Sequence, residues 1–470
     1  MKVLVLNGSP AGDNSITLFT VKYIEALYPD CTFSVLNVGQ HIRKMERDFS
    51  PCAAALQDAD LLLFSYPVYT FLVPAQLHRF VELMKESGVA FAGKYATQIS
   101  TSKHFYDMTA HRFLEDNCRD MGLRVLTGLS ADMDDLMSDK GQKQAVDFFS
   151  HVLWSMENDV YDTRPQPQPG GDSVPLQRAD VSPVAEKRPG RVVIVTDSGA
   201  DKAANAPLAA MIDRLQTLLP YDSAVVDLHE FPFKGGCIGC FNCAATGKCF
   251  YKDGFDDYLR QNIQSADAII YAYTIRDHSM GYRFKLYDDR QFCNGHRTVT
   301  MGKPVGYLVH GALETEPNLL LLMEARAQVG GNYLAGIATD RRDPDGEIRA
   351  LALNLSWALA HSYDQPQNFY GVGGLKIFRD LIYQMQGLMK ADHKFYKQHG
   401  FYDFPQKRKG RLIGMYAVGA LMTNEKLRKK AGGKMTEGMT LPYRKVLSRL
   451  PQRVNPERRE TEAVLTGKQD

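Results

Sequence analysis

The chain lacks the features that would place it in a membrane or outside the cell. No apolar run approaches the roughly 20 residues that a membrane-spanning helix needs. The first ten residues, MKVLVLNGSP, have the pattern of a β-strand, and their apolar run is too short for a secretory signal. Eight cysteines in 470 residues form no disulfide framework, so a reducing, cytoplasmic location is expected.

Several catalytic and binding signatures are also absent. No P-loop lysine follows the first strand and the chain has no G-x-G-x-x-G, which disfavours nucleoside triphosphates and Rossmann dinucleotides. No Ser/His/Asp set or carboxylate pair suited to hydrolysis is visible. No nucleic-acid-binding motif is found, and no nucleic-acid partner is expected.

What the chain does have is an internal repeat. Apolar runs at 2–10 and 191–199 each predict a first strand, and an amphipathic helix pattern follows each of them. Ala59-Asp60 recurs as Ala266-Asp267, 207 residues later, at the start of another apolar run. Short apolar runs that alternate with helix patterns indicate parallel sheets covered on both faces. The sequence therefore predicts an α/β fold with two tandem flavodoxin-like, doubly wound parallel sheets of strand order 2-1-3-4-5.

The repeat and the local composition divide the chain into four parts. Residues 1–158 are the predicted first domain, 159–190 a Pro-rich linker and 191–365 the second domain. Residues 366–470 have no counterpart in the first half, and basic residues outnumber acidic ones there by more than two to one. We expect this last part to be mostly helical, either as a cap on its own protein or as a surface for an anionic membrane or an acidic electron-transfer partner.

Two loops of the first half predict a ligand site, because ligands bind at the carboxyl ends of strands in such sheets. The loop at 7–17 offers small polar donors and the start of a helix, which suits a phosphate. The loop at 65–77 offers aromatic side chains against which a planar ring could lie. Taken singly, these loops could equally be an ordinary strand–helix turn and aromatic core packing.

Together, NGSP…NSIT and YPVYTFLVPAQLHRF resemble the NADPH-dependent FMN reductase and flavodoxin-like flavoprotein family over residues 1 to about 130. One residue is inserted in the phosphate loop, and His78 stands where lysine is usual. The resemblance implies FMN as cofactor, NAD(P)H as donor, and a third flavin loop at 100–107. The residues that it implies for FMN are Ser9, Asn14, Ser15, Thr17, Tyr66, Pro67, Val68, Tyr69, Thr101, Ser102 and Lys103.

Chemistry in that family is carried by the flavin, so no catalytic residue is assigned. Tyr69, Lys103 and His104 are the candidates for tuning the flavin, since a positive group near the ring would stabilise its reduced anion. Lys103 and His104 could equally be solvated surface residues.

The second half departs from this pattern. Asp197-Ser198-Gly199 replaces Gly8-Ser9-Pro10, which puts negative charge where a phosphate would lie, and Thr274-Ile275-Arg276 replaces Pro67-Val68-Tyr69. A second FMN is therefore not expected. Another anion could still be held by Arg276, Arg283 or Lys285.

The second half also carries GGCIGCFNCAATGKC, with the spacing Cys237-x2-Cys240-x2-Cys243-x5-Cys249. Thiolates at this spacing suit a four-cysteine iron–sulfur cluster, and the motif resembles that of the iron–sulfur flavoproteins, which carry a [4Fe–4S] cluster near FMN. A structural zinc and a set of free thiols are the alternatives. The other cysteines are expected to be packing residues: Cys31, Cys52, Cys118 and Cys293.

The predicted function is that of an FMN-dependent NAD(P)H oxidoreductase that reduces a flavin, a quinone or another small acceptor, with the cluster relaying electrons. Because relatives are commonly dimers, the two halves would form a covalent version of such a dimer, and a homodimer of the whole chain is a further expectation. A flavodoxin- or ferredoxin-like electron carrier without its own substrate is the alternative. A ferredoxin-like partner protein is a separate expectation. A scaffold or sensor with a remnant fold is a third.

Overall fold

The computed structural model describes the chain except for residues 164–171, 178–185, 202, 424 and 427–470. Residues 1–401 form one compact unit, and residues from Tyr402 onwards belong to another. Half of the predicted linker, residues 164–171 and 178–185, and the last part of the basic tail lie outside the described residues.

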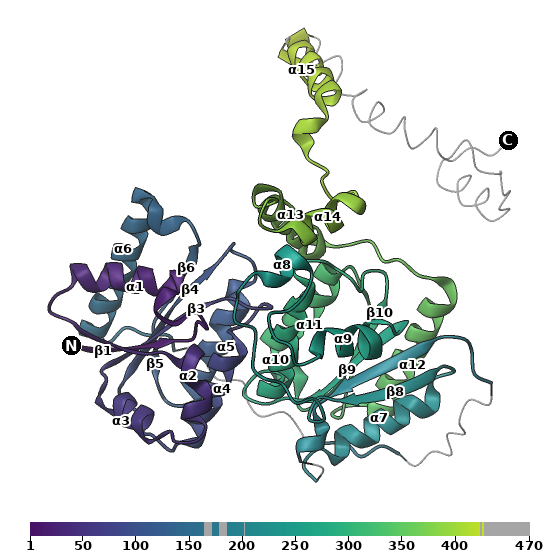
Figure 1. The fold of residues 1–470 in the computed structure, drawn as a ribbon, viewed down its shortest axis with the longest axis horizontal. Coiled ribbons are helices and arrows are strands. Elements are labelled where there is room, and N and C mark those ends of the chain that lie inside the picture. Colours follow the sequence, from purple (N-terminus) through teal and green to yellow (C-terminus); the bar gives the residue numbers. More distant parts are fainter. Residues whose placement is uncertain (164–171, 178–185, 202, 424, 427–470) are drawn as a thin grey trace, which may run out of the picture. The chain divides into compact units, whose positions relative to one another are not determined.

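The first half is a parallel sheet with the strand order β2-β1-β3-β4-β5, and β6 also pairs with β4. Its helices cover both faces of the sheet (Figure 1). The strands are β1 Lys2–Asn7, β2 Thr32–Leu36, β3 Leu61–Pro67, β4 Tyr95–Ser102, β5 Arg124–Val125 and β6 Leu129–Asp132. The helices are α1 Ile16–Leu27, α2 Val38–Met45, α3 Ser50–Asp58, α4 Ala75–Glu86, α5 Asp107–Asp120 and α6 Asp139–Glu157.

The second half repeats this topology. Its sheet has the order β11-β10-β9-β7-β8, which read from the other edge is again 2-1-3-4-5. The strands are β7 Arg191–Thr196, β8 Asp222–Asp227, β9 Ala268–Thr274, β10 Pro304–His310 and β11 Tyr333–Thr339. The helices are α7 Ala206–Leu218, α8 Asn242–Thr246, α9 Phe255–Tyr258, α10 Gly281–Arg290, α11 Pro317–Gly330 and α12 Pro344–His361. The predicted pair of tandem doubly wound sheets is confirmed.

Three apolar layers explain the continuous apolar runs of the strands. Val3 and Val5 pack under α1 and α6, whereas Leu4 and Leu6 face the opposite side of the sheet. That opposite layer continues without a break into the second half, where it includes Val193. A strand buried on both faces needs apolar residues at successive positions, so period-2 alternation is lost.

The two halves meet through equivalent elements, since α4 contacts α10 and α5 contacts α11. The hydrogen bonds there are reciprocal. The Ala75 amide, at the start of α4, donates to Asp289 of α10 over 2.7 Å. The Tyr282 amide, at the start of α10, donates to Glu82 of α4, also over 2.7 Å. Tyr282 and Asp289 are each 207 residues after their counterparts, so the interface is that of a pseudo-twofold dimer within one chain.

Charged groups at the edge of this interface are partly exposed and paired. Lys85 of α4 binds Asp120 and Asp277 at 2.7 and 2.9 Å. The His278 ring lies 2.9 Å from Asp120 and 3.0 Å from Glu316. Burial lowers the pKa of His278, but its hydrogen bonds to the two carboxylates outweigh burial and raise the pKa to about 10.

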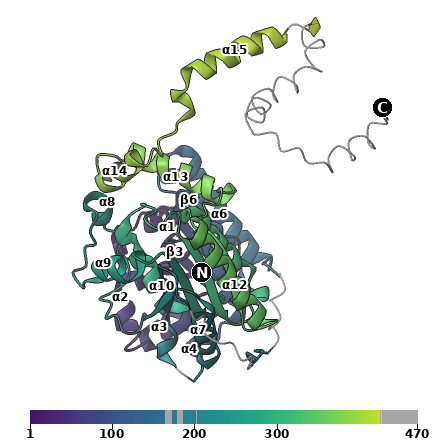
Figure 2. The same ribbon diagram turned by 90° about the vertical axis from the view of Figure 1, so that its right-hand side faces the viewer.

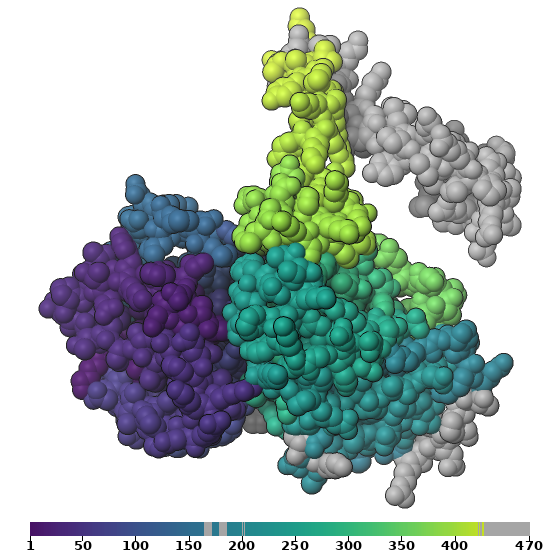
Figure 3. Space-filling view, in the orientation of Figure 1, coloured from purple at the N-terminus to yellow at the C-terminus, as the bar shows by residue number. Residues whose placement is uncertain are grey.

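Within the described residues, three α-helices follow α12. α13 Phe369–Gln384 packs on α11, and α14 Lys390–Gln398 packs on α8. Figures 2 and 3 show both helices against the second half. The third, α15 Lys409–Thr423, belongs to the other unit, and its apolar side chains are exposed. No described helix is long and apolar enough to cross a membrane.

Candidate functional site

Hydrogen bonds from the buried Asn7 side chain hold the loop between β1 and α1 in place. The Asn7 amide nitrogen donates to the Gly12 carbonyl over 3.0 Å and to the Asn37 side chain over 2.9 Å. The Asn7 side-chain oxygen accepts the Ser9 amide over 3.2 Å. These bonds hold the chain in a tight turn that ends at Ser15, where α1 begins.

Ser15 is the N-cap of α1, and its hydroxyl accepts the Leu18 amide over 3.4 Å. The preceding amides of the first turn have no partner within the helix, and the positive end of the helix dipole points the same way. Ser9, Ser15 and Thr17 are buried around this turn, whereas Asn14 is exposed. The turn therefore has the donors and the sign of potential that a phosphate monoester requires.

The predicted ring loop follows β3. Tyr66 is fully buried, and its hydroxyl donates to Gln98 over 2.6 Å, so the side chain packs in the core and only its backbone reaches the loop. Pro67 and Val68 are partly exposed, and the Val68 amide donates to the Thr101 carbonyl over 3.1 Å. This bond joins the second predicted flavin loop to the third.

Tyr69 lies where the two halves meet. Its carbonyl accepts Lys285 of α10 over 2.9 Å, and its ring lies edge-on to Phe292, with 5.6 Å between the ring centroids. A Cβ atom added at Gly239 would lie 2.2 Å from the Tyr69 hydroxyl, so the cysteine loop touches this side chain. Burial raises the pKa of Tyr69 well above its usual value, so the phenol stays protonated.

The third loop, after β4, provides one polar group without a partner among the described residues. Thr101 is buried, and its hydroxyl has no hydrogen-bond partner there. Lys103, in contrast, donates to Asp132 over 2.7 Å and to Asp134 over 3.2 Å. Burial lowers the pKa of Lys103, but these two carboxylates raise it overall, so its charge is present and compensated.

Two other predicted residues of this loop bind their neighbours. The Ser102 hydroxyl accepts the Phe105 amide over 3.4 Å, and the His104 ring lies 3.3 Å from both Asp107 and Ser130. His104 has a positive φ of 52°, which fits a tight loop between strand and helix. Of the three residues considered for tuning a flavin, Tyr69 borders the other half of the chain.

Of the four cysteines of the motif, Cys237 and Cys240 lie on the loop before the short helix α8 and Cys243 lies in α8. Cys249 follows the turn at Gly247. Gln76 of α4 donates to the Cys237 carbonyl over 3.3 Å, which fixes this loop to the first half. Gly239 has a positive φ of 65°, and its missing side chain leaves room for Tyr69. The motif of one half therefore lies against the ring loop of the other.

The thiols differ in burial. Burial raises the pKa of Cys237 well above its usual value and that of Cys243 to about 11, and it also raises the pKa of Cys249. Cys240 is exposed. The donor set suits an iron–sulfur cluster, but no three His, Cys, Asp or Glu side chains among the described residues are grouped so as to hold a metal ion. The four thiols would therefore have to move closer together when a cluster binds.

Of the cysteines expected to be packing residues, Cys52, Cys118 and Cys293 are buried as predicted, whereas Cys31 is partly exposed. Cys31 lies in the first half, just before β2, apart from the motif.

Helices α13 and α14 border the candidate site, which the sequence did not predict. Phe378 of α13 packs on Phe105 of the third flavin loop, with 4.5 Å between the ring centroids. Asp392 of α14 accepts Arg297 over 2.6 Å, and Arg297 also donates to the Cys243 carbonyl over 3.3 Å. No repeat marks these helices in the sequence, and a cap was only one of the alternatives for this region.

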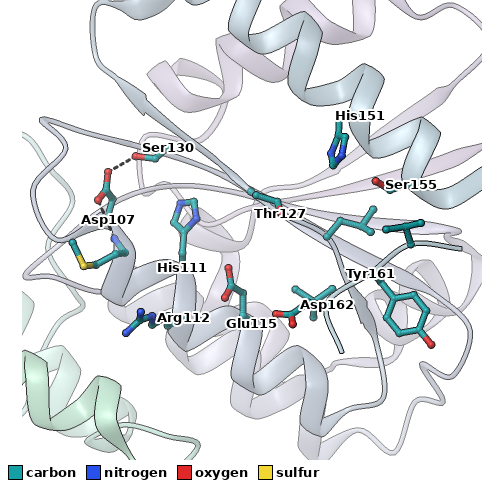
Figure 4. Close-up of a pocket in the computed structure, with 15 residues that line it drawn as sticks. Asp107, His111, Arg112, Glu115, Thr127, Ser130, His151, Ser155, Tyr161 and Asp162 are labelled. Carbon is teal, nitrogen blue, oxygen red and sulfur yellow. Dashed lines mark hydrogen bonds between the residues drawn. The ribbon is translucent and has the colours of Figure 1, made fainter. Parts of the chain in front are cut away.

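A separate pocket of about 660 Å³ lies between α5, α6 and the strands β5 and β6. Figure 4 shows His111 and Glu115 of α5 on one side of it and His151 and Ser155 of α6 on the other. The His111 ring lies 2.7 Å from the Ser100 hydroxyl, and burial lowers the pKa of His111. None of the residues predicted for FMN or metal lines this pocket.

Comparisons with known proteins agree with the resemblance predicted from the sequence. Residues 1–127 match the family of NADPH-dependent FMN reductases. A curated relative, an iron–sulfur flavoprotein of Archaeoglobus fulgidus, is 26% identical over 174 residues, which cover 35% of this chain and 79% of the relative. Both predicted resemblances are thereby confirmed.

One similar solved structure is an NAD(P)H:quinone oxidoreductase from Methanothermobacter marburgensis, which is 15% identical to this chain. The match covers 35% of this chain and 99% of that chain, with a TM-score of 0.27. Another is an FMN-dependent NADH-azoreductase from Bacillus anthracis in complex with FMN, with 12% identity, 34% and 99% coverage, and a TM-score of 0.27.

Proposed function

We propose that this protein is an FMN-dependent oxidoreductase that takes electrons from NAD(P)H and passes them to a small acceptor such as a flavin or a quinone. The observation that carries the proposal is that residues 1–127 match the FMN reductase family, and that the three loops predicted to bind the ligand follow parallel strands of one sheet. Bound FMN would supply the redox chemistry, because it accepts a hydride and releases electrons singly or in pairs.

The residues of the first half have distinct parts in this proposal. Ser9, Ser15 and the first turn of α1 would hold the phosphate, and Asn14 and Thr17 would flank it. The backbone at Tyr66 and Pro67, with Val68, would face the polar edge of the ring. The free hydroxyl of Thr101 would donate to the ring or accept from it. Lys103 would contribute little net charge, because Asp132 and Asp134 balance it.

Tyr69 and Phe105 would exclude water from the ring. Tyr69 is covered by the cysteine loop and Phe292, and Phe105 is covered by Phe378 of α13. A ring enclosed between the two halves would be reached only by a thin, flat acceptor.

We further infer that Cys237, Cys240, Cys243 and Cys249 hold a [4Fe–4S] cluster. Two observations support this inference: the motif touches Tyr69 across the interface, and the curated relative is called an iron–sulfur flavoprotein. Such a cluster would transfer one electron at a time. Structural zinc and free thiols remain the alternatives for these residues.

One sample decides among these assignments. The protein is purified without oxygen, and its absorption spectrum is measured together with iron, zinc and flavin. Flavin together with about four irons would support the cluster, provided that the iron is lost in Cys237→Ala and kept in Cys31→Ala. Flavin without iron would leave the thiols as packing or redox residues. A colourless protein that binds no added FMN would refute the whole proposal.

An electron carrier is the second candidate, since the same fold and cofactors would serve it. Steady-state NAD(P)H oxidation with a dye acceptor separates the two functions, because a carrier alone shows almost none. A ferredoxin-like partner, a homodimer of the whole chain and a cytoplasmic location stay predictions. So do the domain limits at 158, 190 and 365, and contact of the basic tail with a membrane.

A further inference from the structure

A second pocket, of about 410 Å³, lies at the interface between the halves. It opens at the carboxyl ends of the second sheet, where Asp197 follows β7, His229 follows β8 and Arg276 follows β9. Helices α2 and α4 of the first half close it through Arg43, Glu46, Arg79 and Glu82. By the pseudo-twofold, it is the counterpart of the candidate flavin site.

At two positions of this site the second half has arginines. Arg276 takes the place of Tyr69, and Arg283 takes the place of Gln76, each 207 residues later. The turns themselves are the same, because Thr70 and Asp277 have positive φ values of 43° and 49°. The backbone of the turn is therefore kept while the side chains at these positions differ.

Part of the charge in the pocket cancels. Arg79 binds Glu46 at 3.3 Å and Glu82 at 2.8 Å, and Glu82 also accepts the Tyr282 amide. These three charged groups belong to the interface and are satisfied there. An anion entering the pocket would not displace them.

Three guanidinium groups remain. No carboxylate among the described residues forms an ion pair with Arg43, Arg276 or Arg283. Arg43 donates to the backbone carbonyls of Phe233 and Lys234, over 3.4 Å for Phe233. Arg283 lies 3.4 Å from the His229 ring and 5.9 Å from the centre of the Phe233 ring. The pocket thus gathers cations whose counter-charge the protein does not supply.

Besides Glu46 and Glu82, which bind Arg79, the pocket is lined by one further acidic group, Asp197. It is buried, and burial raises its pKa to about 7, with Asp227 nearby adding to the rise and Arg276 and Arg283 opposing it. Burial and Arg283 together lower the pKa of His229, so this ring is neutral near pH 7. Over the neutral and weakly acidic range, the pocket therefore keeps a net positive charge.

Lys285, which the sequence also offered as an anion ligand, has a different place. Its ammonium group is fully buried and binds Asp289, Thr70 and the Tyr69 carbonyl. It belongs to the interface and does not line the pocket.

We propose that this pocket binds the oxyanion group of a small molecule, a phosphate monoester or a dicarboxylate, between Arg276 and Arg283 of the second half and Arg43 of the first. Guanidinium groups pair with such oxyanions through two parallel hydrogen bonds. The aromatic faces of Phe233 and Tyr282 border the same pocket and give the organic part of the ligand an apolar surface. The proposal does not depend on flavin binding in the first half.

Titration calorimetry on the full-length protein, at pH 6.5 and low salt, tests it with three probes: inorganic phosphate, adenosine monophosphate and succinate. Saturable binding of any of them is expected, and the pattern tells phosphate from carboxylate ligands. Arg276→Gln and Arg283→Gln should each weaken it about tenfold or more, because each removes a charged hydrogen-bond donor. The control Arg349→Gln, which changes an exposed arginine of α12, should leave it unchanged.

Two further variants test the pH dependence of binding and distinguish this pocket from the phosphate turn of the first half. Asp197→Asn should strengthen binding at pH 8, where the native carboxyl is charged, and flatten its pH dependence. Ser15→Ala changes the phosphate turn of the first half. If Ser15→Ala weakens binding and Arg276→Gln does not, the anion occupies the first half and the proposal fails. It also fails if none of the probes binds to a protein whose melting curve shows it folded.

Discussion

The buried ion pair at the interface allows a quantitative test of the pseudo-dimer. Lys285 and Asp289 are fully buried and bind each other within α10. Asp289 also accepts the Thr70 hydroxyl over 2.8 Å and the Ala75 amide over 2.7 Å. Replacing Asp289 by alanine leaves the Lys285 ammonium in the interior without a counter-charge, which should cost about 3–5 kcal/mol of stability.

Glu82 is the matched control, because it occupies the equivalent position and accepts the equivalent amide. It is partly exposed, with 14% of its side chain accessible. It also lies beside Arg79, which keeps Glu46 and Glu86 as partners if Glu82 is removed. Glu82→Ala should therefore cost clearly less than Asp289→Ala, about 1–2 kcal/mol.

The two tryptophans make each half separately visible. Trp154 lies in α6 of the first half and Trp357 in α12 of the second. Urea unfolding of Trp154→Phe and Trp357→Phe proteins, followed by fluorescence, therefore reports one half at a time. We expect Asp289→Ala to lower both transitions and to separate them, because the shared layer between the halves is weakened.

The double variant Lys285→Met, Asp289→Ala decides the cause. It removes the stranded charge, so it should recover at least about 1 kcal/mol of what Asp289→Ala loses. If Asp289→Ala costs less than about 1 kcal/mol, or if the double variant is no better than the single one, the buried pair does not hold the halves together as argued.

Three further predictions concern other parts of the chain. Asn14→Asp should weaken FMN binding roughly tenfold by repulsion of the phosphate, without harming α1, and should leave riboflavin binding unchanged in fluorescence titrations. His278→Gln should cost most stability below about pH 6.5 and progressively less towards pH 10, because folding raises the pKa of His278 to about 10 and so stabilises the protonated ring. Denaturant midpoints measured across this pH range test this expectation. They would show the reverse trend if the ring were neutral in the folded protein. Gly239→Ala should lower the melting temperature. Adding Tyr69→Phe to this variant should restore part of the loss, because it removes the hydroxyl that lies 2.2 Å from the new Cβ. If the melting temperature does not recover, the strain comes from the positive φ of residue 239 alone.

Much of the fold could be predicted because its signals are local. Apolar runs such as 2–7 and 61–67 become buried strands, and the repeat gives the second sheet from the first. The places of individual side chains could not be predicted in the same way. Tyr66 was expected at the ring but packs against Gln98, because a residue at the end of a buried strand can face either layer.

The partners of charged residues could not be predicted either. Lys103 follows β4 at the predicted site, but its partners Asp132, at the end of β6, and Asp134, just after it, come 29 and 31 residues later. Lys285 carries the positive charge expected of an anion ligand. Its ammonium group instead binds Thr70 and Tyr69, which lie in the other half of the chain. Such contacts depend on the packing of the halves, which no local pattern records.

A duplicated chain can change one of its two sites without changing the other, whereas a substitution in a homodimer alters both sites at once. The structure shows where this freedom was used. The residues that join the halves remain reciprocal, since Glu82 and Asp289 accept equivalent amides over equal distances. The residues at the strand ends do not, since Tyr69 corresponds to Arg276. Selection on the interface and on the two sites can therefore act separately. One half can keep the loops that match the FMN reductase family while the other gathers arginines and cysteines around the same backbone.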